Sequence, residues 1–134
     1  MAIRNVRLAA TVRNAALNAA VAALSGGYLQ FYTGAQPTSS DVAVGSQVLL
    51  ASLPLSTPAA GSAAGGSVTF NPVTPSVALA SGVAAWFRLV ASDGVTGIVD
   101  GTVSTDGSGD LLLNDLNFTL GATVQVSTFT LSQQ

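Results

Sequence analysis

The chain contains no histidine, cysteine, lysine or glutamate, and only 7% of its residues are charged. Without histidine and cysteine there can be no Ser-His triad, no thiolate nucleophile and no zinc site built from nitrogen and sulfur ligands. Without lysine there is no Schiff base and no P-loop lysine. No disulfide can cross-link the fold. We therefore predict that the protein is not an enzyme, that it needs no cofactor, and that it has no catalytic or metal-ligating residues.

The few charged residues that are present argue against binding to nucleic acid. Four arginines against six aspartates give a formal net charge of −2. Because a nucleic-acid-binding surface needs clustered positive charge, we predict no nucleic-acid partner.

An ordinary domain carries about 25% charged residues, which keep its surface soluble. This composition instead favours a subunit that contacts copies of itself over large areas. The alternative is a monomer coated with neutral Ser, Thr, Gly and Ala.

The first 27 residues, MAIRNVRLAATVRNAALNAAVAALSGG, are predicted to form an amphipathic helix of about 20 residues that ends at Gly26 and Gly27. A helical projection places five polar residues in one stripe: Arg4, Arg7, Thr11, Asn14 and Asn18. No apolar run approaches the roughly 20 residues that cross a membrane, so we predict no membrane partner. Three arginines followed by a short apolar run also resemble a secretion signal, which remains the alternative.

The apolar arc of this helix is wider than the stripe that a surface helix buries against its own domain. We therefore expect the excess to contact a second surface, either another copy or a different protein. The candidate interface residues are Leu8, Val12, Leu17, Val21, Leu24, Tyr28, Tyr32 and Trp86.

After Gly27 the pattern changes to short alternating or apolar segments separated by Gly, Pro and Asp. These segments predict a single antiparallel β-sandwich or jelly-roll-like domain of seven to eight strands over residues 28–134. Residues 84–91 and 98–103 are predicted to form a hairpin around the turn at 93–97. The segment 56–66, STPAAGSAAGG, is predicted to be a flexible, exposed loop that tolerates insertion.

Aspartates and one arginine are the remaining candidates for chemistry. Asp106, Asp110 and Asp115 lie close together in the sequence, but they do not match a calcium-binding loop and are predicted to be solvated turn residues. Whether they bind a cation is left open. Arg88 is alone on an otherwise hydrophobic strand, so we expect it to pair with an aspartate or to pack at an interface.

The order of several segments resembles that of small virion proteins of tailed bacteriophages. These segments are the Ala-rich helix, GGYLQFYTGAQP, the Gly/Ala/Ser loop, AAWFRLVASDG, VDGTVS, DLLLN and GATVQVSTFTLS. The resemblance implies a structural subunit of the virion, assembled in the host cytoplasm, and in particular a capsid decoration (cement) subunit. Its partners would be copies of itself and a major capsid protein or a neck or tail protein.

Other functions stay open beside this one. The chain could instead be a neck, collar or tail-associated subunit of the virion. A secreted adhesin-like domain predicts cleavage of the chain near residues 23–25. A carbohydrate-binding domain requires Tyr28, Tyr32 and Trp86 to share an exposed patch, because stacking on a sugar needs accessible rings.

Overall fold

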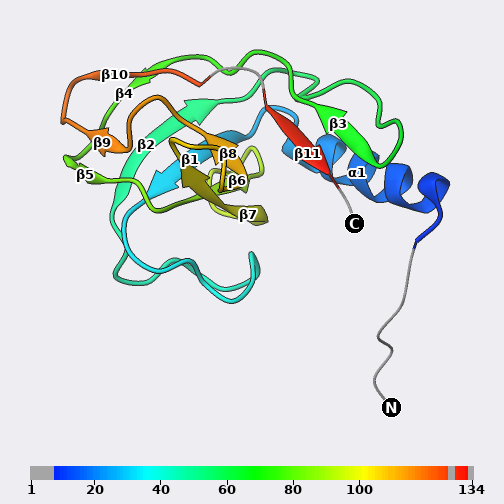
Figure 1. Cartoon of the computed structure of the whole chain (residues 1–134), viewed down its shortest axis with the longest axis horizontal. Coiled ribbons are helices and arrows are strands. Elements are labelled where there is room, and N and C mark those ends of the chain that lie inside the picture. Colours follow the sequence, from blue (N-terminus) through cyan, green and yellow to red (C-terminus); the bar gives the residue numbers. More distant parts are fainter. Residues whose placement is uncertain (1–7, 127–128, 133–134) are drawn as a thin grey trace.

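The computed structural model describes residues 8–126 and 129–132. One helix and eleven strands lie in this part of the chain (Figure 1). In chain order they are α1 (Ala10–Leu24), β1 (Tyr28–Tyr32), β2 (Leu49–Pro54), β3 (Ser67–Thr69), β4 (Ser76–Val77), β5 (Gly82–Val83), β6 (Trp86–Val90), β7 (Gly97–Ser104), β8 (Leu111–Leu112), β9 (Asn117–Phe118), β10 (Thr123–Val124) and β11 (Thr130–Ser132).

The strands form one five-stranded sheet and three two-stranded ladders. The sheet has the order β2-β1-β6-β7-β8, and β4 pairs with β10, β3 with β11 and β5 with β9. The mainly β class with an N-terminal helix is therefore confirmed. A single sandwich of seven to eight strands is not confirmed, because several expected strands shrink to two-residue pieces between Gly, Pro and Asp turns. The main sheet is also mixed, since β8 runs parallel to β7.

The predicted hairpin is the centre of the sheet. β6 pairs antiparallel with β7, and β1 pairs antiparallel with both β6 and β2. Alternation along these strands places Leu29, Phe31, Phe87 and Leu89 on one face, where all four are buried in the main hydrophobic cluster. Every residue of β6 is buried. The central strand is therefore covered on both faces of the sheet.

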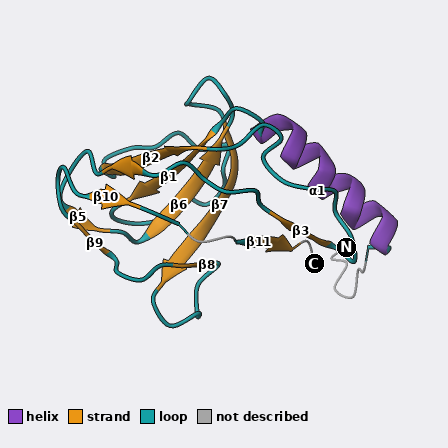
Figure 2. Cartoon of the chain, turned by 90° about the horizontal axis from the view of Figure 1, so that it is seen from above, coloured by secondary structure: helices purple, strands orange, loops and turns teal. Residues whose placement is uncertain are grey.

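Helix α1 lies at one end of the molecule, where it contacts β3 and β7 (Figure 2). Leu17, Val21 and Leu24 are buried and belong to the same hydrophobic cluster as the sheet. Their spacing puts all three on one stripe of the helix, so a narrow stripe of large aliphatic side chains joins α1 to the domain. Because Gly27 has no side chain, the chain can pass close to the carbonyl oxygen of Val90 as it enters β1.

The segment 56–66 packs against α1. The side-chain oxygen of Asn18 accepts a hydrogen bond from the backbone of Ala63 at 2.9 Å, and that of Asn14 accepts one from Gly66 at 2.9 Å. Within the segment, Ala59 and Ala60 are buried, whereas Gly61 is exposed. The polar stripe of the helix therefore binds this loop. Arg4 and Arg7, the two charged residues of the predicted stripe, lie outside the described residues.

A substitution tests the inner stripe of α1. Leu24→Ala should lower the free energy of unfolding by about 2–5 kcal/mol, because Leu24 is completely buried and alanine would leave a cavity. Ala23→Ser, at the neighbouring exposed position, should cost no more than about 0.5 kcal/mol through helix propensity. Urea denaturation of both variants measures the difference, and equal midpoints would mean that α1 contributes little to the core.

Candidate functional site

The face of the sheet opposite the hydrophobic core carries a row of polar side chains. The strand register aligns Ser52 of β2 with Gln30 of β1, Gln30 with Arg88 of β6, and Arg88 with Asp100 of β7. Gln30 is 6% exposed and Arg88 3% exposed. Because buried polar groups must find partners, this row determines how the loops above it pack.

Arg88 and Asp100 form a two-pronged ion pair in this row. Arg88 Nε lies 2.7 Å from Asp100 Oδ1, and its Nη2 donates to Asp100 Oδ2 at 2.8 Å. The hydrogen bond to Asp100 raises the pKa of Arg88 above its ordinary value. The guanidinium also lies over the ring of Trp86, 5.3 Å from its centroid. The expectation that Arg88 pairs with an aspartate is confirmed.

Tyr32 and Trp86 are buried beside this pair. Their rings stack with centroids 4.7 Å apart, and the Tyr32 hydroxyl donates to Gln30 Oε1 at 2.8 Å. Burial raises the pKa of Tyr32. The Trp86 indole nitrogen donates to the backbone oxygen of Thr33 at 3.2 Å. Tyr32 and Trp86 are internal packing residues, which corrects their expected role at an interface, whereas Tyr28 is partly exposed.

A cavity of about 470 Å³ lies between the polar row and two loops. Gln30, Tyr32 and Arg88 form its floor, and residues 40–44 and 94–97 line the rest. The polar groups of the floor hold these loops: Arg88 Nη2 reaches the Ser39 carbonyl at 3.4 Å, and Gln30 Nε2 reaches the Gly94 carbonyl at 3.3 Å. The geometry of the row therefore accounts for a structural role, in which the sheet positions its own covering loops.

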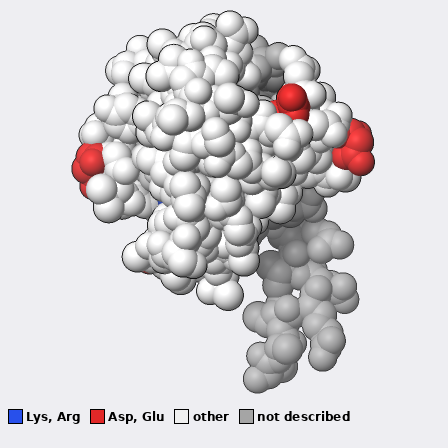
Figure 3. Space-filling view, turned by 90° about the vertical axis from the view of Figure 1, so that its left-hand side faces the viewer, with Lys and Arg blue, Asp and Glu red and all other residues white. Residues whose placement is uncertain are grey.

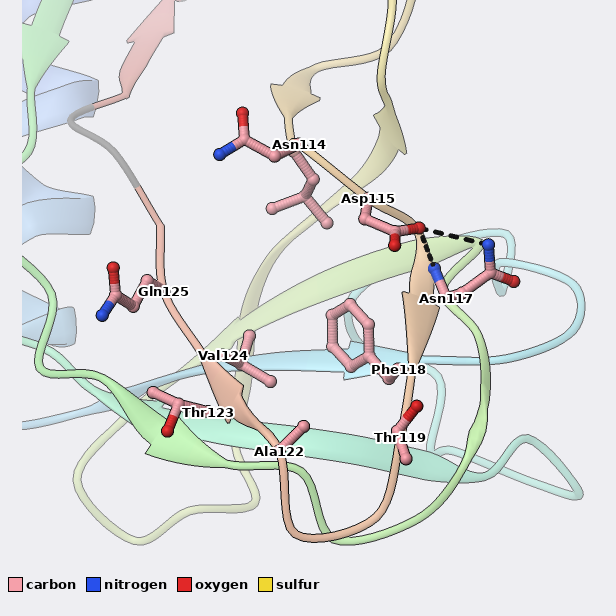
Figure 4. A pocket seen from close by; sticks show the side chains of 10 residues that line it. Asn114, Asp115, Asn117, Phe118, Thr119, Ala122, Thr123, Val124 and Gln125 are labelled. Carbon is pink, nitrogen blue, oxygen red and sulfur yellow. Dashed lines mark hydrogen bonds between the residues drawn. The ribbon is translucent and has the colours of Figure 1, made fainter.

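A smaller pocket of about 300 Å³ lies between β9 and β10 (Figure 4). Phe118 and Val124 line its apolar side, and polar side chains that include Asn114 and Gln125 line the remainder. Asp115 also lines this pocket, but its carboxylate accepts two hydrogen bonds from Asn117, one from the backbone and one from the side chain. The carboxylate is thus held in a local turn.

The carboxylates of the other two candidate aspartates are also occupied by hydrogen bonds within the chain. Asp106 accepts a hydrogen bond from the backbone of Ser108, while Asp110 accepts from the backbone and hydroxyl of Thr102. Hydrogen bonds from Ser108 lower the pKa of Asp106, and those from Thr96 lower the pKa of Asp93. Among the described residues, no three acidic side chains gather into a group that could hold a metal ion. Asp106 and Asp115 therefore hold local turns, whereas Asp110 joins the residue before β8 to Thr102 of β7.

The structure divides the helical interface candidates between the two sides of α1. Leu17, Val21 and Leu24 are buried in the core of the same chain, which corrects the expectation that they contact a second molecule. Leu8 is 39% exposed and Val12 50% exposed. A further set of exposed residues shares the outer side of the helix with Val12. We call this set, with Val12, the alanine face: Val12, Ala15, Ala16, Ala19, Ala22 and Ala23.

Sequence reasoning missed several of the residues that organise these regions. It did not assign partners to Asn14, Asn18, Gln30 or Asp100. A usable signal was present for Gln30, because it alternates with Leu29 and Phe31 and therefore had to lie on the second face of its strand. For the helix, the size of the side chains could have predicted which side is buried. The inner stripe holds the leucines and the valine of residues 17–24, whereas the outer side is mostly alanine.

No known protein family matches this chain, and neither a curated protein nor a solved structure does. In the part of the chain that the structure describes, no helix is both long enough and apolar enough to span a membrane.

The ion pair gives a direct prediction for stability. Asp100→Asn should lower the free energy of unfolding by about 3–5 kcal/mol, because it leaves the charge of Arg88 buried without its counter-charge. Replacing both partners, Arg88→Met with Asp100→Leu, should restore most of this loss, since no unpaired charge then remains. Chemical denaturation measures both. A double variant as unstable as Asp100→Asn would show that the remaining hydrogen bonds of the pair matter more than its charge.

Tyr32 gives a prediction for alkaline pH. Because burial raises its pKa, the folded chain keeps the phenol proton at a pH where the unfolded chain releases it. The free energy of unfolding should therefore fall as the pH rises above about 10, the ordinary pKa of tyrosine. Tyr32→Phe should reduce this slope. Tyr28→Phe is the matched control and should retain the slope, because Tyr32 is still present. Thermal melts between pH 8 and 11 distinguish these outcomes.

Proposed function

We propose that the chain is a non-enzymatic structural subunit of a tailed-bacteriophage virion, and specifically a capsid decoration (cement) subunit. The observation that carries the proposal is the alanine face of α1. The helix already buries Leu17, Val21 and Leu24 inside the domain, yet the alanine face on its outer side is apolar and uncharged. A helix whose outer side faced only water would normally carry charged residues there.

The distribution of charge supports the same proposal. The ion pair Arg88–Asp100 is buried, and Arg13, the single charge in the helix sequence, lies on the inner side against Gly66. The charged side chains that the described part of the chain exposes are five aspartates in loops and turns, and none of them lies on the alanine face. A subunit repeated many times in an assembly needs apolar contact surfaces of this kind. We propose a phage particle as the assembly because the ordering of the sequence segments resembles that of small virion proteins.

Two of the alternatives receive less support from the geometry. The carbohydrate-binding reading required Tyr28, Tyr32 and Trp86 to form an exposed patch, but Trp86 is 1% exposed and Tyr32 is 7% exposed. The secreted-domain reading required cleavage near residues 23–25. Such a cleavage would remove Leu17 and Val21 from the hydrophobic core. A neck, collar or tail-associated position in the virion remains the alternative to decoration.

Location in the particle tests the proposal. An antibody raised against the recombinant chain should label intact phage particles, banded by density, from the source that encodes it. Labelling should cover the head surface if the chain is a decoration subunit, and only one vertex or the tail if it is a neck or tail subunit. Tail-less heads provide the control that separates these two positions. Detection of the chain only in the soluble or secreted fraction, with none in particles, would contradict a virion role.

A further inference from the structure

Three of the six aspartates are each followed by a glycine: Asp93, Asp100 and Asp106. An Asp-Gly pair can rearrange without an enzyme, because glycine has no side chain that would shield its backbone nitrogen from the preceding carboxyl group. The rearrangement requires that this nitrogen is free and that the peptide unit can turn toward the carboxyl carbon. The three pairs differ in both respects.

The pair of Asp93 and Gly94 is held by hydrogen bonds. Gly94 N donates to the Ala91 carbonyl at 2.9 Å. The Asp93 carboxylate accepts hydrogen bonds from the backbone nitrogens of Val95 and Thr96 at 2.9 and 2.8 Å, and also from the Thr96 hydroxyl. The nitrogen and the carboxylate of this pair are thus both occupied.

The pair of Asp100 and Gly101 is held by the sheet. The Asp100 carboxylate binds Arg88 through two hydrogen bonds, and its side chain is only 4% exposed. Gly101 is buried opposite Phe87 in the ladder of β6 and β7. A Cβ atom added to Gly101 would lie 2.5 Å from the Phe87 ring, so this peptide unit has no room to turn.

The pair of Asp106 and Gly107 is far less restrained. It lies in the connection between β7 and β8, which projects from the body of the molecule (Figure 2). Both residues are exposed, and a Cβ atom added to Gly107 would have no neighbour within 4 Å. Gly107 N has no hydrogen-bond partner among the described residues. The Asp106 carboxylate accepts a hydrogen bond from Ser108 N at 2.9 Å, which leaves the Gly107 nitrogen free.

No basic side chain in the described part of the chain pairs with Asp106. The single ion pair within residues 8–126 and 129–132 joins Arg88 to Asp100. On the face that Figure 3 shows, acidic side chains lie at the surface and almost no arginine is visible. The carboxyl group of Asp106 can therefore change its position without breaking an ion pair.

We infer that Asp106 is a modification site, at which the folded chain converts spontaneously to isoaspartate. Gly107 N loses its proton and attacks Cγ of Asp106, so that an N–Cγ bond forms, a Cγ–O bond breaks and a water molecule leaves. Water then adds to the resulting succinimide ring. If it breaks the N–Cγ bond, aspartate returns; if it breaks the original peptide bond, the main chain runs through Cγ. Water leaves in the first step and is consumed in the second, so no oxidant, reductant or cofactor takes part.

The modification is independent of the proposed function, and it should leave the chain folded. It adds a methylene group to the main chain between β7 and β8 and turns the α-carboxyl group into a side group. The contacts that hold β8 lie on either side of Asp106. Gly109 N donates to the Ser104 hydroxyl, and the Asp110 carboxylate accepts from Thr102 N.

A protease that cuts before aspartate but not before isoaspartate distinguishes the three pairs. The chain has no glutamate, so the internal cuts fall only before aspartates. Isomerisation of Asp106 leaves residues 100–109 as one fragment, whereas the same change at the other two pairs leaves residues 93–105 or 41–99 uncut. Mass spectrometry identifies each fragment. Incubation in heavy-oxygen water adds one heavy oxygen when the ring opens, which separates isomerisation from incomplete digestion.

The folded chain, incubated at neutral pH, should accumulate the fragment 100–109 with one heavy oxygen. The fragments 93–105 and 41–99 should stay at the level found in fresh protein. In urea all three fragments should accumulate, because unfolding frees every Asp-Gly pair. The denatured chain therefore measures what the sequence alone allows, and the folded chain measures what the structure selects.

Two variants test the role of the Gly107 nitrogen. Gly107→Ala should strongly slow the formation of fragment 100–109, because the added methyl group shields the attacking nitrogen. Gly121→Ala is the matched control: Gly121 has a φ of 84°, close to the 87° of Gly107, and open space at its Cβ position. It carries the same backbone strain but leaves the Asp-Gly pair intact, so it should form the fragment at the unmodified rate.

Several outcomes would overturn the inference. Equal accumulation at all three pairs in the folded chain would mean that packing does not select Asp106, and faster accumulation at another pair would mean that it selects a different site. Accumulation in urea alone would show that the hydrogen bond from Ser108 holds Asp106 as firmly as the other two are held. An unchanged rate in Gly107→Ala would exclude attack by this nitrogen. None of these results bears on the virion role, which the labelling of particles tests.

Discussion

The ion pair between Arg88 and Asp100 is the constraint on which the arrangement of this domain depends. Arg88 lies on the central strand of the sheet, with both partners of the pair almost fully withdrawn from solvent. An arginine cannot release its proton to escape the cost of burial, so its counter-charge must be held in place. β7 has to present Asp100 in register with Arg88, and the loops at residues 39–40 and 94 have to cover the row. The pair thus couples strand register to loop position.

The consequence for the surface is an unusual division of polar and apolar groups. The second face of an antiparallel sheet is often solvated and polar. Here its polar side chains are enclosed beneath loops, and Gln30, Arg88 and Asp100 bond to one another or to backbone. Apolar side chains are exposed instead, on the outer side of α1 and at the opposite end of the molecule. With so few charges in the chain, enclosing this pair leaves even fewer charged side chains on the surface.

Helix α1 uses only part of its surface for contacts within the fold. Leu17, Val21 and Leu24 attach it to the core, and the amide side chains of Asn14 and Asn18 bind the segment 56–66. These contacts use the inner side and one flank of the helix. The alanine face remains outside them. A substitution on that face therefore removes no core contact.

The sequence by itself determined the local features of this protein. Alanine-rich helical residues ending before Gly26, the alternating strand after them, and the hairpin of residues 84–91 and 98–103 all follow from short-range patterns, and the structure has them. Even the pairing of Arg88 with an aspartate followed from the cost of burying one charge. The choice of Asp100 among six aspartates did not, because it depends on the register between two strands. The order β2-β1-β6-β7-β8 and the parallel pairing of β8 were likewise decided by tertiary contacts. Tertiary contacts also buried one side of α1. Apolar residues cover most of the helix, but only the side with the larger residues Leu17, Val21 and Leu24 packs into the hydrophobic core, because larger side chains bury more apolar area.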